Sequence, residues 1–181
     1  MYDTDYYATG VLKSRICSMI VNSNKVRDAL KYNGTDAREP FDPSDPMTYM
    51  WNCVYPFLKD PDSITTADPQ VLVGVNTVTN AVDSRLINCC VTIYVVINND
   101  DMKTDSAYIR EDLLADGIVN ITKADLVTDA ILEALTSEDS KTWIGDIYDI
   151  STSELSLNNA VHYARRITLY TKEVNLFDRG I

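Results

Sequence analysis

The stretch SRLINCCVTIYVVIN, residues 84–98, decides the fold. One set of alternating positions in it is wholly apolar, namely Ile87, Cys89, Val91, Ile93, Val95 and Ile97. The intervening positions mix polar and apolar side chains. A period of two indicates a β-strand. One apolar and one mixed face predict a core strand with a partly covered reverse side.

Three other segments have a similar pattern. QVLVGVNTVT, residues 70–79, alternates in the same way, and the NAVDS that follows is short enough for an antiparallel connection. Nearer the end of the sequence, WIGDIYDI (143–150) and VHYARRITLYTKEV (161–174) also indicate strands. In the last of these, one face carries Val161, Tyr163, Ile167 and Leu169.

Helical periodicity flanks these strands. Residues 9–30 carry an apolar stripe, and Asn22 or Ser23 is placed to cap a second short helix that Gly34 ends. After a polar loop at 98–105, one helix is expected to stop at Gly117. Another is expected to begin with a capping-box-like Thr122 and a stripe over 126–135. Asp105 or Ser106 would cap the first of these two helices.

Residues 33–69 have a different character because they hold every proline of the chain. Such density prevents long regular elements. Large aromatic rings interleave with the prolines, which a solvated linker would not carry. We therefore expect a long ordered arm. The whole prediction is a single α+β domain over 1–181, with a mainly antiparallel sheet, helices on one side and this proline-rich arm.

The charge and composition of the chain argue against several classes of function. The chain has 27 acidic and 16 basic residues, a net charge of −11. That charge argues against a general nucleic-acid-binding surface. No segment reaches the roughly 18–20 apolar residues of a membrane span, and the opening MYDTDYYATG is unlike a signal peptide. The four cysteines have no zinc-like spacing and are expected to be reduced and buried.

Residues suited to catalysis or metal binding are sparse, and we expect no catalytic, cofactor or metal site. His162 lies in a predicted strand with no nucleophile motif, so a structural histidine is the favoured interpretation. Asp100, Asp101 and Asp105 could offer oxygen ligands to calcium, but the EF-hand spacing is absent and a solvated loop is favoured.

Some aromatic and basic residues are candidates for a subunit interface. Aromatic rings dominate interface energies, yet the same rings could equally belong to the core. Arg165 and Arg166 should point to opposite faces of their strand, and one of them could pair with a carboxylate across a subunit contact or on the surface. The interface candidates are Trp51, Tyr55, Phe57, Trp143, Tyr148 and Arg165.

Several stretches resemble the tail terminator (tail-completion) and related neck proteins of long-tailed bacteriophages. These stretches are VYPFLKDPDSI (54–64), INCCVTIYVVIN (87–98), the helix around Arg110, Asp112, Leu113 and Leu114, and ARRITLYTKEVN (164–175). The resemblance covers roughly residues 9–175 and rests on the order of elements. It carries no functional residue across.

The resemblance implies a structural protein of the virion, made in the host cytoplasm. Such proteins form a homo-oligomeric, usually hexameric, ring that caps the tail tube and meets the head connector. DNA would pass through the ring without specific binding, and acidic charge suits that passage. The alternatives are a connector-side neck adaptor or stopper, a cytoplasmic module that binds a peptide partner, and a small enzyme of unfamiliar type.

Overall fold

The computed structural model describes residues 4–32, 34, 37–78, 86–103, 121–155, 157–158 and 161–175. Its helices are α1 (Thr4–Asn22), α2 (Asn24–Leu30), α4 (Lys123–Thr136) and α5 (Glu138–Ile144). Its strands are β1 (Val54–Tyr55), β2 (Gln70–Val78), β3 (Leu86–Asn98), β4 (Asp146–Leu155) and β5 (His162–Asn175). Short 3₁₀ turns, η1 (Pro46–Tyr49), η2 (Pro61–Ser63) and η3 (Asn99–Asp101), complete it.

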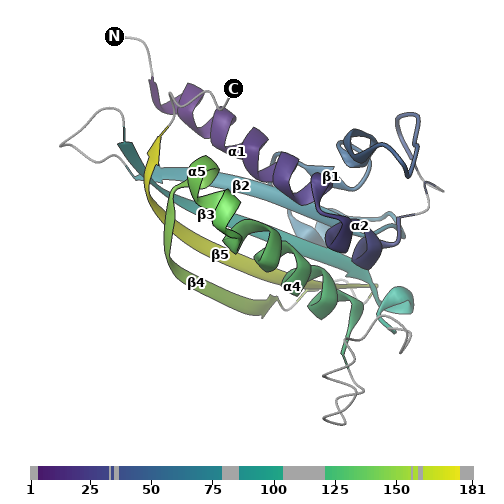
Figure 1. Ribbon diagram of the computed structural model, residues 1–181. Helices are drawn as coiled ribbons and strands as arrows, with labels where there is room; N and C mark the ends of the chain where they lie inside the picture. Colours follow the sequence, from purple (N-terminus) through teal and green to yellow (C-terminus); the bar gives the residue numbers. More distant parts are fainter. Residues whose placement is uncertain are drawn as a thin grey trace, which may run out of the picture.

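The strands form a single sheet in the order β1-β2-β3-β5-β4. Pairing is antiparallel except for β1, which lies parallel to β2. The helices cover one face of the sheet (Figure 1). The predicted α+β class, the mainly antiparallel sheet and the placement of the helices on one side are all confirmed.

The main core lies between the helices and the sheet. The apolar face predicted for residues 84–98 points into it, since Cys89, Val91, Ile93, Val95 and Ile97 are all buried there. Helices α1 and α4 contribute the largest fully buried side chains on the opposite side, namely Leu12, Ile16, Ile20, Ile131 and Leu135.

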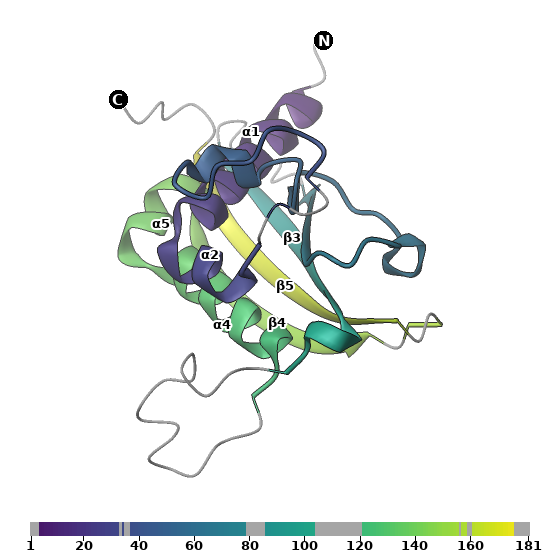
Figure 2. The ribbon, with the colours of Figure 1, turned by 90° about the vertical axis from the view of Figure 1, so that its right-hand side faces the viewer.

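The proline-rich arm bends around the β1 edge of the sheet (Figure 2). Its first half joins the main core through Tyr49 and Val54, while Tyr55 and Ile64 pack on the other face of the sheet. Gly74 of β2 makes this close approach possible, because a Cβ there would lie 2.6 Å from the Leu58 side chain. The arm therefore covers part of the reverse face of the sheet.

Local capping matches the sequence closely in two helices. The Ser23 hydroxyl accepts from the Val26 backbone N–H at the start of α2. Thr122 and Asp125 form a reciprocal capping box at the start of α4. However, α2 ends at a left-handed Lys31 (φ 47°) and not at Gly34.

The structure differs from the sequence-based expectations at one strand and one cysteine, and one expected helix is not described. The strand predicted at 143–150 is shifted: Trp143 and Ile144 end α5, Gly145 breaks the chain direction, and β4 continues to Leu155. Cys90 is only half-buried, whereas Cys17, Cys53 and Cys89 are buried as predicted. The helix predicted to end at Gly117, with Arg110, Asp112, Leu113 and Leu114, lies outside the described residues, as does Asp105.

Candidate interaction surfaces

An aromatic cluster lies at the β1 edge of the sheet. The Trp51 and Phe57 ring centroids are 6.0 Å apart, and those of Tyr55 and Phe57 are 5.7 Å apart. The Lys59 ammonium lies 4.3 Å from the Tyr55 ring centroid and 5.7 Å from that of Phe57, within cation–π range. We call Trp51, Tyr55, Phe57 and Lys59 the arm cluster. Its rings and one cation form a surface rather than a core, except at Tyr55.

Exposure differs sharply within the arm cluster. Trp51 is 51% exposed and Phe57 37%, whereas Tyr55 is 3% exposed and donates its hydroxyl to the Asn52 carbonyl oxygen at 2.7 Å. Of the three arm residues proposed for an interface, two are therefore available to a partner. Tyr55 supports them from below as part of the chain's own packing.

Trp51 is held in an unusual backbone conformation. Its φ is +67°, in the left-handed region that bulky side chains rarely adopt. Its N–H donates to the Val54 carbonyl oxygen at 2.9 Å, which closes the turn into β1. Strain of this kind costs about 1–3 kcal/mol and gathers at functional positions. A half-exposed tryptophan kept in such a turn is consistent with a binding role.

A buried asparagine that sequence reasoning missed holds the arm in shape. Asn52 is 5% exposed, and its Oδ1 accepts from the N–H groups of Arg38 and Glu39 at 2.9 and 3.1 Å. Its Nδ2 donates to the Thr48 carbonyl oxygen at 2.8 Å. No pattern in the sequence distinguishes Asn52 from the other asparagines, because its partners are backbone groups.

Lys59 and Arg38 supply positive charge beside the rings of the arm cluster. Across the described part of the chain, no carboxylate lies within ion-pair distance of either side chain. Burial against the rings, together with the nearby Arg38 guanidinium, lowers the pKa of Lys59. Asp45 and Asp60 cap η1 and η2. Burial, helped by the charge of Asp68, raises the pKa of the Tyr55 hydroxyl.

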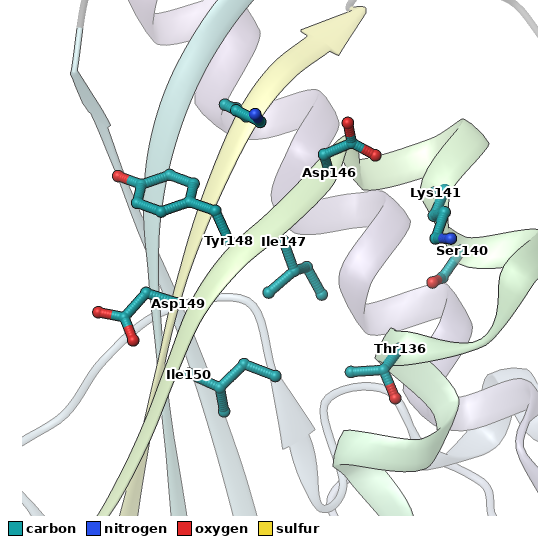
Figure 3. Close-up of a pocket in the computed structure, with 9 residues that line it drawn as sticks. Thr136, Ser140, Lys141, Asp146, Ile147, Tyr148, Asp149 and Ile150 are labelled. Atoms are coloured by element: carbon teal, nitrogen blue, oxygen red, sulfur yellow. The ribbon is translucent and has the colours of Figure 1, made fainter.

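The second surface lies at the opposite edge of the sheet, on β4. A register shift between Ile147 and Asp149 sets Tyr148 in a bulge. Tyr148 and Asp149 therefore point to one side of the strand, and Ile147 and Ile150 to the helix side (Figure 3). Tyr148 is 59% and Ile150 42% exposed. We call Tyr148 and Asp149, together with Ile150 on the other side of the same edge strand, the β4 edge surface.

The helix side of β4 borders an open hollow of about 560 Å³. Thr136, Ser140 and Lys141 line it from α4 and α5, opposite Ile147 and Ile150 (Figure 3). The Ser140 hydroxyl donates to the Ser137 carbonyl oxygen, and Lys141 pairs with Glu138 at 3.1 Å. Asp146, Asp149 and Lys172 add charged groups to the lining, so the hollow is a mixed polar and apolar border of the β4 edge.

The structure does not bring Trp143 into the β4 edge surface. The Arg15 guanidinium lies 5.9 Å from the Trp143 ring centroid and donates to its carbonyl oxygen at 2.9 Å. Trp143 thus ties α5 to α1, with 44% of its surface still exposed. Its predicted place in a strand was wrong because the helix continues to Ile144.

Arg165 is engaged within its own chain. Its guanidinium lies 2.9 Å from the Asp125 carboxylate on α4 and 3.7 Å from that of Glu154 on β4. Arg166, as expected, points to the other face, where it is exposed. The sequence left open a pairing across subunits or on the chain's own surface. Arg165 pairs with Asp125 of α4 and so contributes to holding that helix on the sheet.

A family model named YomW matches residues 14–171. The chain belongs to the YomW family. That name is of the type given to phage-associated proteins of Bacillus prophages, and membership is consistent with a phage origin. No curated protein and no solved structure matches the chain. The arm cluster and the β4 edge surface both lie inside the matched part of this YomW-family chain.

The residues considered for catalysis or metal binding contact other groups of the YomW-family fold. His162 is 5% exposed, and its Nε2 lies 2.9 Å from the Thr66 carbonyl oxygen. The Asp101 carboxylate pairs with the buried Lys123 ammonium. Within the described ranges, no group of three or more potential ligands could hold a metal ion, and no helix is long and apolar enough to cross a membrane.

Proposed function

We propose that this chain is a structural virion protein that forms a closed ring at the head–tail junction, where it caps the tail tube and joins it to the head connector. The observation that carries the proposal is the placement of two different exposed surfaces on opposite edges of one sheet, the arm cluster beside β1 and the β4 edge surface. Four strand spacings separate these edges, which is about 20 Å.

This placement favours a ring because of symmetry. A two-fold dimer uses the same patch on both subunits, whereas a ring of more than two subunits needs two different patches that meet head to tail. Exposed Trp, Tyr and Phe side chains are the residues that most often anchor such contacts. The phage-type family name and the net charge of −11, which would let DNA slide through a central hole, support the same proposal.

The test combines negative-stain electron microscopy with light scattering on one sample of purified protein. We expect particles with a central hole and a mass that is a whole multiple of the 20.3 kDa chain. Filaments that do not close would contradict the capping function.

The open β4 edge gives one observation in favour of a second function, a module that binds a peptide. Among the described residues, β4 has no strand partner on its outer side, and an extended peptide can pair with such an edge. A protein that stays monomeric at every concentration would favour this function over the ring.

A further inference from the structure

We propose that the arm cluster of one copy docks directly on the β4 edge surface of the next, so that these two surfaces are the two halves of a single repeating contact. The inference rests on the proposed ring and specifies which side chains hold it together. Its occupant is a second copy of this chain.

Charge complementarity points to this pairing. The arm cluster presents the Lys59 ammonium on its aromatic rings, with Arg38 nearby, and neither cation has a carboxylate within ion-pair distance among the described residues. On β4, Asp149 is exposed and is likewise without a cation at that distance within the described part of the chain. Of the other charges beside it, Lys172 lies opposite Asp146 across the strand pair and lines the same hollow as Asp149.

Aromatic complementarity points the same way. Each surface offers a half-exposed ring braced by a second ring: Trp51 by Phe57 on the arm, and Tyr148 by Tyr170 on the sheet, with centroids 6.1 Å apart in the latter pair. Rings braced in this way lose little conformational freedom on binding. Because the two surfaces lie at opposite edges of the sheet, the arm cluster cannot contact the β4 edge surface of its own chain.

The shape of the β4 edge favours a side-chain contact over indiscriminate strand pairing. A bulge and an outward carboxylate, both present at Tyr148 and Asp149, are devices that hinder edge-to-edge aggregation. A partner that supplies an aromatic ring and a cation could pack the ring on Tyr148 and pair the cation with the Asp149 carboxylate. The strained turn at Trp51 presents such a ring against Phe57, and the Lys59 ammonium lies 5.7 Å from the Phe57 ring centroid.

The test uses two variants that each disable one surface. Trp51→Gly removes the ring and relieves the positive φ, so the chain should fold at least as well as before. Tyr148→Thr removes the other ring and keeps a residue suited to a strand. Each variant alone should be monomeric, with the dissociation constant of the contact raised at least about thirtyfold.

Mixing the two variants gives the decisive measurement. Tyr148→Thr keeps an intact arm and Trp51→Gly an intact β4 edge, so an equimolar mixture should give a one-to-one dimer of twice the 20.3 kDa chain mass and nothing larger. If the arm instead paired with the arm of another copy, Tyr148→Thr alone would dimerise and the proposal would fail.

A charge exchange tests the specific pair. Lys59→Glu and Asp149→Lys should each weaken assembly, and the two changes in one chain should restore it, which no purely structural role of either residue would produce. Rings that persist in Trp51→Gly and Tyr148→Thr would overturn this contact while leaving the ring function intact. One-to-one dimers from a protein that forms only open filaments would support the contact and overturn the ring.

Discussion

Gly145 joins α5 to β4. Adding a single methyl group at this position should strongly lower the free energy of unfolding. Its backbone has φ +76° and ψ −173°, a region that is essentially restricted to glycine. A Cβ added there would lie 2.5 Å from the Lys172 carbonyl oxygen and 3.1 Å from the Val174 Cα. Both atoms are backbone of β5, so neither can move aside without disturbing the β4–β5 pairing.

The expected cost of Gly145→Ala follows from these two effects. Backbone strain in this region costs about 1–3 kcal/mol, and forcing an extra group into a packed site costs about 1–3 kcal/mol more. We therefore expect a loss of about 4 kcal/mol in the free energy of unfolding. For a chain of this size, that lowers Tm by roughly 8–16 °C.

The assay is urea and thermal unfolding followed by circular dichroism at a concentration where the protein is monomeric. Gly10→Ala is the matched control, because it makes the same substitution within α1, where a Cβ would meet nothing within 4 Å. It should stabilise the protein by up to about 1 kcal/mol. A Gly145→Ala variant that loses less than about 1 kcal/mol with an unchanged m-value would refute the reasoning.

Three further predictions concern the helix cap and the thiols. Thr122→Ala should lower the free energy of unfolding by about 1 kcal/mol because it removes the hydroxyl half of the capping box, whereas Thr122→Ser should keep most of it; equal unfolding midpoints for the two variants would contradict this. Of the four cysteines, only half-buried Cys90 should react quickly with a thiol reagent in native protein, and two or more fast thiols would contradict the burial described above. Burial raises the pKa of Cys17 and Cys89 from 9.0 to about 12, so above about pH 9 unfolded thiols lose protons that folded thiols keep. Stability should therefore fall as pH rises through that window, and a urea midpoint that is the same at about pH 8 and pH 10 would argue against it.

Much of the fold could be predicted because its strongest signals are local. The alternation in residues 84–98 predicted β3 and the face it buries, and Thr122 with Asp125 predicted the start of α4. Both depend on interactions between near neighbours in the sequence. The arm was recognisable because proline excludes regular structure while aromatic side chains require something to pack on.

The wrong predictions concern segments whose secondary structure depends on contacts between residues far apart in the sequence. Residues 143–150 alternate well enough to indicate a strand, yet Arg15 of α1 binds the end of α5 and keeps Trp143 in the helix. The two-residue β1 depends on its pairing with Val71 and Leu72 and has no pattern of its own. For the interface candidates, the sequence indicated the right kind of residue, but only the three-dimensional packing separates exposed Trp51 from buried Tyr55.

The position of β5 in the sheet has a consequence for the order of events during synthesis. It is the last strand in sequence order among the described residues, yet it lies between β3 and β4. Until the ribosome has released residues up to Asn175, β4 has no neighbour to pair with, and neither its bulge nor Tyr148 can take up the positions seen here. The β4 edge therefore takes its final shape only late in synthesis, after β5 has followed it out of the ribosome.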